Sequence, residues 1–329
     1  MTMHNKKILF FLLFLLTSAT SLLAVDTELL TDYRNNGLKD IEQKLDKQLT
    51  QKSYWQEYLK NIDTSFGYLE SFDDILACNK AASKLKIYHR DSNNTFTLLN
   101  QFHAYTGKNK GDKQTQGDLK TPIGVYCLTK KISNVDPFYG PMAFVTSYPN
   151  IYDKYKGKTG QGIWIHGFPL HQKRDTYTKG CIAVHNENLK SLDKSINLKK
   201  ALLIIDEKSV NEERSKKDLV QVLSNLFSWR YAWIYNDLDK YLSFYSQNFK
   251  RYDGMDLAHF KKYKTRIFHK NEKKTIIFSQ INVIPYPETT NLYKITFKEN
   301  YKSGSFSFNG DKILIVKLSK NKFSIITEQ

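Results

Sequence analysis

The chain has 329 residues, a formal net charge of +17 at pH 7 and three cysteines. This length exceeds what one hydrophobic core usually serves, so we expect two or three domains. The lysines are scattered among acidic residues rather than gathered into an aromatic-interleaved stripe, which argues against nucleic-acid binding. The positive charge fits either attraction to an anionic polymer, such as a cell wall rich in carboxylates, or a solvated lysine-rich surface.

Residues 1–24 have the pattern of a secretory signal peptide. Lys6 and Lys7 precede an apolar run from Ile8 to Leu16, and small residues follow that run. The run is shorter than the ~20 apolar residues that a membrane-spanning helix requires. We therefore expect cleavage between Ala19 and Ala24 and export of the mature protein, with an uncleaved membrane anchor as the alternative.

Residues 25–71 are predicted to be mainly helical and polar. One narrow apolar stripe recurs at spacings of three and four residues and is then extended by aromatic residues; it comprises Leu38, Ile41, Leu45, Leu49, Tyr54, Trp55, Tyr58 and Leu59. Such a stripe cannot form a core alone. It must dock on the next domain or on a second copy of itself, and we favour a homodimer.

Strand patterns dominate residues 72–207. The stretch "ILACNKAASKLKIYHR" predicts two strands joined at Ala81 and Ala82, and further strands follow in "TFTLLNQFH", Val125–Leu128, "GIWIH" and "ALLIID". Glycines and Pro122 mark a loop in "GDKQTQGDLKTPIGVY". We expect a β-rich domain built almost wholly of strands and loops, in which Cys78 and Cys127 are buried, inert thiols.

Residues 208–329 change from helical to strand patterns. Ser209 and Glu212 predict a capping box that opens a long helix, and "DLDKYLSFYS" predicts a second helix. After Phe260 we expect strands, with Asn309-Gly310 as a tight hairpin turn. Helices followed by an antiparallel sheet indicate an α+β domain whose helices cover one sheet face. The isolated His259 and His269 are interpreted as surface or core residues without a catalytic role.

The stretch "IWIHGFPLHQKRDTYTKGCIAVHN", residues 163–186, concentrates four groups that bind protons or metals, namely His166, His171, Cys181 and His185. A cysteine attacks as the thiolate and usually needs a histidine to take its proton. Gly180 lets successive backbone N–H groups face the space before the sulfur, as an oxyanion hole requires. Gly167 lets the chain turn away beneath the His166 ring. We predict acyl transfer through a Cys181 thioester with His166 as the base.

Two alternatives remain for this stretch, a zinc site and an inert loop. The separation of the two histidines and that of Cys181 from His185 fall within the range that zinc sites use. Structural zinc prefers more than one sulfur ligand, however, and no second cysteine lies nearby. Pro169 also breaks any helix that would align His166 with His171. We therefore expect neither a metal nor another cofactor.

The His-Gly pair at 166–167 and "TKGC" at 178–181, with the upstream "GDKQTQGDLKTPIGVY", resemble the motifs of the YkuD family of L,D-transpeptidases. The resemblance covers about Phe72 to Asp206 and implies a β-sandwich-like catalytic domain that acts on peptidoglycan stem peptides. It implies Cys181 as the nucleophile and His166 as the general base, with the Gly167 carbonyl orienting the imidazole. It also implies that the amides of Gly180 and Cys181 are the oxyanion donors.

The motif departs from the family at two positions. Lys179 stands where the family usually has His, and Ala183 stands where it usually has Arg. Both positions face the substrate in the family, so we expect Lys179 or Arg174 to hold the terminal carboxylate of the peptide here. Thr178, Gly180 and Trp164 complete the predicted set of oxyanion and substrate-binding residues.

The three-part layout further resembles the cell-shape-determining L,D-carboxypeptidases of helical Gram-negative bacteria. It implies a multi-domain α+β protein with a signal peptide (1–24), a helical region (25–71), a YkuD-like catalytic domain (72–207) and a domain similar to nuclear transport factor 2 (NTF2-like, 208–329). The implied activity is removal of the terminal D-alanine from tetrapeptide stems in the periplasm, which influences cell shape. The alternatives are an L,D-transpeptidase and a non-catalytic wall-binding scaffold. A glycan or protein ligand of the C-terminal domain is a further hypothesis.

Overall fold

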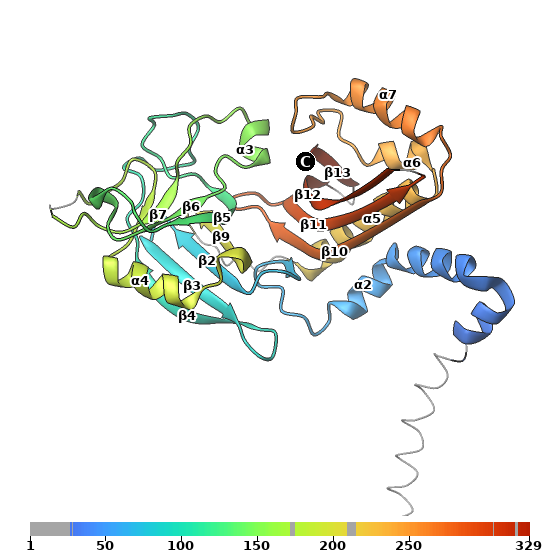
Figure 1. Cartoon of the computed structure of the whole chain (residues 1–329), viewed down its shortest axis with the longest axis horizontal. Coiled ribbons are helices and arrows are strands. Elements are labelled where there is room, and N and C mark those ends of the chain that lie inside the picture. Colours follow the sequence, from blue (N-terminus) through green and yellow to red (C-terminus); the bar gives the residue numbers. More distant parts are fainter. Residues whose placement is uncertain (1–26, 28, 172–174, 209–214, 305, 320–321) are drawn as a thin grey trace, which may run out of the picture.

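The computed structural model describes residues 27, 29–171, 175–208, 215–304, 306–319 and 322–329. The predicted signal peptide, Arg174 and the predicted capping box of Ser209 and Glu212 lie outside these residues. Within the described ranges, no helix combines the length and apolarity that a membrane span needs. Figure 1 shows two sheet-containing domains side by side, with the N-terminal helical region beside the C-terminal one.

The N-terminal region consists of a helix at 29–49 and helix α2 (Lys52–Tyr58). Its apolar stripe is divided. Trp55 and Leu59 are buried in the core of the C-terminal domain, and the Trp55 indole donates a hydrogen bond of 2.7 Å to the Leu49 carbonyl. In contrast, Leu38 is 69% exposed and Leu45 is 46% exposed. Part of the stripe therefore docks within the chain, on the C-terminal domain rather than on the next domain along the sequence.

The first domain contains an eight-stranded sheet with the strand order β4-β3-β2-β9-β5-β6-β7-β8. The strands are β2 (Asp74–Asn79), β3 (Lys84–Arg90), β4 (Phe96–His103), β5 (Gly124–Ile132), β6 (Ala143–Thr146), β7 (Trp164–His166), β8 (Ile182–Ala183) and β9 (Ala201–Asp206). The predicted hairpin through Ala81 and Ala82 is confirmed, since β2 and β3 pair antiparallel on either side of it.

The prediction that this domain contains almost only strands and loops was wrong. Two helices, α3 (Ile151–Tyr155) and α4 (Asn186–Ser195), and two short 3-10 turns, η1 (Pro137–Tyr139) and η2 (Leu198–Lys200), lie between its strands. Helix α4 buries just Leu189 and Leu192. Its apolar face is thus too short to produce a clear helical period in the sequence.

The second domain packs three helices against a five-stranded sheet of order β1-β10-β11-β12-β13. The helices are α5 (Lys216–Ile234), α6 (Leu238–Ser243) and α7 (Leu257–Phe268). The strands are β1 (Tyr68–Leu69), β10 (Lys274–Pro285), β11 (Leu292–Ser303), β12 (Phe306–Ser319) and β13 (Lys322–Glu328). Ser215 caps α5 by accepting a hydrogen bond from the Lys217 N–H. The predicted multi-domain α+β class is confirmed.

Two local predictions for this domain were wrong. The chain does not turn to strands after Phe260, because α7 continues to Phe268. Asn309-Gly310 is not a hairpin turn, because β12 runs through both residues and pairs them with Asn300 and Glu299. A Cβ atom on Gly310 would lie 2.6 Å from the Phe308 ring. The glycine therefore makes room for that ring inside a strand.

An apolar core joins the two domains. Ile75, Val125 and Leu202 from the eight-stranded sheet belong to the same buried cluster as Ile284 and Ile315 from the C-terminal sheet. Strand β1, which precedes the first domain in the chain, pairs antiparallel with β10 of the C-terminal sheet. Both features fix one domain against the other, since separating them would expose fully buried apolar side chains.

Candidate active site

The predicted catalytic residues lie at one edge of the eight-stranded sheet. Strands β7 and β8 are parallel neighbours, and His166 pairs with Ala183 in their register. Cys181 directly precedes β8, two residues before Ala183. The Val184 N–H donates a hydrogen bond of 3.0 Å to the His166 carbonyl, which locks the two segments together. Residues 15 positions apart in the sequence are thus carried by adjacent strands.

His166 is held in one orientation. The residue is 2% exposed, and its Nδ1 lies 2.7 Å from the carbonyl oxygen of Gly167. A carbonyl accepts hydrogen bonds, so Nδ1 carries the proton and Nε2 is the basic nitrogen. The ring also meets the Tyr139 ring edge-on, with centroids 5.0 Å apart and planes at 89°. These contacts give the imidazole the tautomer and rigidity that a general base needs.

The turn before Cys181 is organised by Thr178. Its hydroxyl accepts a hydrogen bond of 2.9 Å from the Gly180 N–H and donates one of 2.7 Å to the Cys181 carbonyl. Gly180 has a φ of +136°, and a Cβ there would lie 2.9 Å from the Lys120 carbonyl oxygen. A side chain is therefore excluded on two grounds, backbone conformation and space.

This geometry bears on the expected oxyanion donors. The Gly180 N–H points to the Thr178 hydroxyl and not toward the front of the sulfur. The Cys181 thiol is half-buried and lies 3.5 Å from the Gly162 carbonyl oxygen. Of the two amides that the sequence pattern offered, the amide of Cys181 is therefore the better candidate to face a developing oxyanion.

The predicted substrate-side residues near this turn differ in how exposed they are. Trp164 is half-buried and packs on Tyr139 with ring centroids 5.1 Å apart. Thr178 is buried, and Lys179 is exposed beside it. Ala183 is fully buried in β8, so this position does not present a side chain to solvent. Arg174 lies outside the described residues.

Sequence reasoning missed Tyr139. It lies in the short turn η1, which no motif marks, and its ring contacts both Trp164 and His166. Burial, together with the charges of Cys181 and Asp136, raises the pKa of its hydroxyl. Its ring contacts therefore place this tyrosine beside the imidazole of His166.

The other two histidines of the stretch are not brought to the sulfur. His171 is exposed, and the exposed His185 precedes α4, where its ring packs on Phe168 at 4.4 Å. Among the described residues, no group of three His, Cys, Asp or Glu side chains is placed to hold a metal ion. Cys78 is fully buried, as predicted, and burial raises its thiol pKa to about 12. The prediction that Cys127 is also buried was wrong, because its side chain on β5 is only half-buried.

The C-terminal domain contains a cavity of about 610 Å³ between α7 and its sheet. Aromatic residues and charged residues line it together, among them Trp233, Tyr301, Phe306, Lys264 and Glu299. Lys264 is buried with its Nζ 4.3 Å from the centroid of the Trp233 ring, and burial lowers its pKa to about 8. Among the described residues, none forms a hydrogen bond with the buried Trp233 Nε1 or Glu299 Oε2.

Both domains match known families. Residues 73–205 match the YkuD L,D-transpeptidase catalytic domain, and residues 221–329 match the Cds6 C-terminal NTF2-like domain. The sequence is 34% identical over 79 residues to YafK of Escherichia coli (strain K12). That match covers 24% of this chain and 29% of YafK, so the chain spans about three tenths of this curated relative.

Two solved structures resemble most of the chain. The helical cell shape determining protein Pgp2 from Campylobacter jejuni matches with a TM-score of 0.78 and 39% identity, over 85% of this chain and 99% of Pgp2. Bd1075 of Bdellovibrio bacteriovorus matches with a TM-score of 0.62 and 28% identity, over 78% of this chain and 92% of Bd1075. The chain therefore belongs to the family that includes Pgp2, in which a YkuD L,D-transpeptidase domain precedes a C-terminal NTF2-like domain.

Proposed function

We propose that this protein is a peptidoglycan L,D-carboxypeptidase that removes the terminal D-alanine from tetrapeptide stems. His166 takes the proton of the Cys181 thiol, and the thiolate attacks the carbonyl carbon on the L-centre of diaminopimelate. The tetrahedral intermediate collapses to a thioester, and His166 returns the proton to the departing amine of D-alanine. A water molecule, activated by the same imidazole, then hydrolyses the thioester and regenerates the thiol.

The observation that carries this proposal is the parallel pairing of β7 with β8. It brings Cys181 next to the strand that ends in His166, while the Gly167 carbonyl holds the imidazole with Nε2 as the basic nitrogen. A nucleophile beside a base whose orientation a third group fixes is the arrangement that covalent acyl transfer requires. The membership of the chain in a peptidoglycan-related family supports the choice of substrate.

The substrate-side residues support hydrolysis of a short stem. Lys179 is the exposed cation next to the nucleophile and is suited to bind the carboxylate of D-alanine, with Arg174 as the other candidate. Trp164 and Tyr139 form an aromatic wall beside His166. Thr178 holds the turn, and the Cys181 amide supplies the oxyanion contact.

One experiment separates the candidate activities. Tetrapeptide muropeptides are incubated with the wild type, with Cys181→Ser and with Cys127→Ser as a matched thiol control, and the products are identified by mass spectrometry. A carboxypeptidase gives tripeptides in the wild type and the control but not in Cys181→Ser. Cross-linked dimers would instead identify an L,D-transpeptidase. Unchanged substrate in every sample would reject the proposed enzyme, and the non-catalytic wall-binding scaffold would then be the remaining alternative.

The proposed location is the periplasm. Extracytoplasmic action fits a family that works on peptidoglycan, and residues 1–24 have the composition of a cleavable signal peptide. The N-terminal residue of the protein recovered from a periplasmic fraction tests both points. A new N-terminus between residues 20 and 25 is expected, whereas intact protein in the cytoplasm would contradict the assignment.

The C-terminal cavity is a second candidate binding site, and we assign it to a peptidoglycan glycopeptide. Its aromatic walls suit sugar rings. Its buried lysine suits a polar ligand, as do the indole and carboxylate atoms that have no hydrogen-bond partner within the described residues. Phe306→Ala, which alters the exposed rim, should weaken sedimentation of the protein with purified sacculi. Ile277→Ala on β10 is the control, because Ile277 is also more than half exposed but does not line the cavity. Equal sedimentation of all three proteins would reject this assignment.

The uncovered part of the N-terminal helix is proposed to pair with a second copy of the chain. Leu29, Leu30, Leu38 and Leu45 are all at least 45% exposed on this helix. A homodimer would cover them and would present two active sites to one wall surface. Sedimentation velocity should show a dimer for the wild type and a monomer for Leu38→Glu, and a monomeric wild type would reject the homodimer.

A further inference from the structure

The loop of residues 107–123 lies against the turn that carries Cys181. The Lys108 N–H donates a hydrogen bond of 3.1 Å to the Thr178 carbonyl, and the Lys120 carbonyl occupies the space that a Gly180 side chain would need. The Thr121 hydroxyl lies 3.5 Å from the Cys181 carbonyl oxygen. Displacement of this loop would therefore displace the backbone beside the sulfur.

Two aspartates hold the loop in shape. Asp118 acts inside it, accepting hydrogen bonds from the Lys113 ammonium and from the backbone N–H groups of Gln114, Thr115 and Lys120. Asp112 ties the loop to the rest of the domain. Its Oδ1 accepts from the Ile123 N–H at 2.9 Å, and its Oδ2 forms an ion pair of 2.6 Å with Lys158.

Lys158 continues the connection into the domain core. Its side chain is 3% exposed and forms a second ion pair of 2.9 Å with Asp153, whose side chain is fully buried. Burial lowers the pKa of Lys158, but its contacts with Asp153 and Asp112 outweigh burial and the net shift is upward. A buried pair of this kind restricts geometry strongly, because breaking it leaves an uncompensated charge in the interior.

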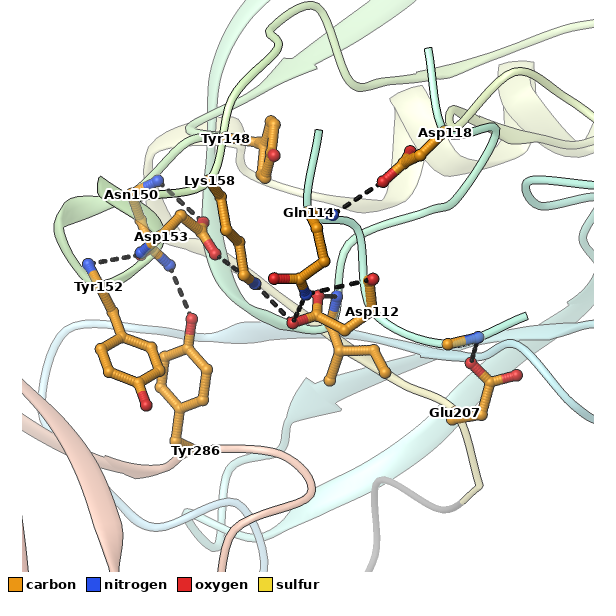
Figure 2. A network of polar contacts seen from close by, with 12 residues as sticks. Asp112, Gln114, Asp118, Tyr148, Asn150, Tyr152, Asp153, Lys158, Glu207 and Tyr286 are labelled. Atoms are coloured by element: carbon orange, nitrogen blue, oxygen red, sulfur yellow. Dashed lines mark hydrogen bonds and ion pairs between the residues drawn. The ribbon is translucent and has the colours of Figure 1, made fainter. Parts of the chain in front are cut away.

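The connection ends in the C-terminal domain. Asp153 accepts a hydrogen bond from the Asn150 N–H, and the Asn150 side chain donates one of 3.1 Å to the hydroxyl of Tyr286, between β10 and β11. Figure 2 shows Asp112, Lys158, Asp153, Asn150 and Tyr286 as one chain of polar contacts. A Cβ on Gly124 would lie 2.6 Å from the Tyr286 hydroxyl, so this residue fits closely against the catalytic sheet.

We propose that Asp112 is a positioning residue for Cys181, and that Tyr286 of the C-terminal domain acts on the nucleophile turn through Asn150, Asp153, Lys158 and Asp112. The C-terminal domain then contributes to the chemical step as well as to binding. This inference deepens the proposed function, on which its kinetic readout rests. Its physical basis is that a small misplacement of a nucleophile costs far more in rate than in stability.

The test compares three full-length variants with the wild type. Asp112→Asn removes the charge that pairs with Lys158, and Tyr286→Phe removes one hydroxyl at the far end of the connection. Tyr155→Phe is the matched control. Its hydroxyl also bridges the domains, donating to the Asn248 carbonyl at 3.0 Å, but within the described part of the chain it forms no hydrogen bond with Asp112. Melting temperatures establish that each variant is folded.

Two readouts are measured. The first is the rate of iodoacetamide alkylation at Cys181 across pH 5–9, followed by peptide mapping with Cys127 as an internal reference. The second is kcat and KM on a tetrapeptide muropeptide. We expect Asp112→Asn to lower kcat by about tenfold with little change in KM and to alter the pH profile of Cys181 alkylation. Tyr286→Phe should act in the same direction more weakly, and Tyr155→Phe should match the wild type.

Folded Asp112→Asn and Tyr286→Phe proteins with the wild-type alkylation profile would overturn the inference. An equal effect in Tyr155→Phe would also overturn it, since general loosening of the domain interface would then be the cause. If Asp112→Asn fails to fold, Tyr286→Phe decides alone. If the wild type releases no D-alanine, the proposed function fails, while the alkylation profile still decides the inference.

Discussion

The candidate active site at the edge of the YkuD domain and the cavity of the C-terminal domain both contain ionisable groups, but they differ in how their buried polar atoms are paired. At the candidate active site, His166 and Thr178 are each oriented by a hydrogen bond to backbone. In the cavity, the buried Trp233 indole and a Glu299 oxygen have no hydrogen-bond partner among the described residues. Since unpaired buried polar atoms are costly, the first arrangement suits a fixed reaction geometry and the second suits a ligand that completes it.

The largest expected effect is the loss of activity, without loss of wall binding, when the proposed nucleophile is replaced. Cys181→Ser should lower kcat for D-alanine release by on the order of 10³-fold or more, because a serine hydroxyl is a far weaker nucleophile beside the same base. Binding to sacculi should persist if the C-terminal cavity provides it. Release of D-alanine is followed by coupled assay. Full activity of the serine variant would show that Cys181 is not the nucleophile.

The next effect concerns the cost of the buried cation in the cavity. The pKa of Lys264 is lowered to about 8 from 10.5, so the folded state binds its proton more weakly than the unfolded state. Its charge therefore destabilises the fold below pH 8, and this cost disappears as pH rises to about 10.5. Relative to Lys264→Met, wild-type stability should gain about 3 kcal/mol over that range.

The measurement for Lys264 is denaturant unfolding at pH 7 and at pH 10.5. Lys298→Met, which changes a half-exposed lysine on the same sheet, controls for the loss of one positive charge. A stability difference between wild type and Lys264→Met that does not change with pH would mean that the lysine keeps its ordinary pKa and that the cavity is better solvated than its geometry indicates.

A smaller effect is expected where the active site depends on backbone. Gly180→Ala introduces a Cβ that meets the Lys120 carbonyl and forces a φ of +136° on a residue that disfavours it. We expect a loss of about 1–3 kcal/mol in stability and a clear fall in kcat. Gly157→Ala is the control. Gly157 has a φ of +72° with open space around it, so an alanine there causes the same kind of backbone strain without the clash. Equal kcat in both variants would show that the close approach at Gly180 does not position the sulfur.

The smallest expected effect is a pH dependence of the loop beside the site. Burial raises the pKa of Asp118, but hydrogen bonds from Lys113 and three backbone N–H groups lower it further, to about 2. A carboxyl whose pKa is depressed in the fold stabilises it above the unfolded value of 3.8, and this contribution is lost as pH falls toward 2. The melting temperature of Asp118→Asn should therefore fall less between pH 4 and pH 2 than that of the wild type. Asp193→Asn, which breaks the exposed ion pair with Lys131, should show the same fall as the wild type.

Several predictions from sequence were confirmed because they rest on local patterns. The β2–β3 hairpin follows from two strand-like runs joined at Ala81 and Ala82, and β9 follows from the apolar run of "ALLIID". The family assignment rests on the His-Gly and Gly-Cys motifs, and it was confirmed. Helix α4, Tyr139 and the role of Gly310 were not predicted, because each depends on neighbours that are distant in sequence or on a single ring contact.

The sequence by itself determined the residue types of the candidate site, since cysteine, histidine and glycine at these spacings are read from the chain alone. Only the tertiary structure decided how they are used. Parallel pairing of β7 with β8 brings Cys181 beside His166. The Thr178 hydroxyl accepts a hydrogen bond from the Gly180 N–H. Tyr286 from the other domain accepts one from Asn150, in the polar network behind the site. The physical reason is that these contacts arise between segments that the fold brings together, and a local pattern contains no record of its long-range partners.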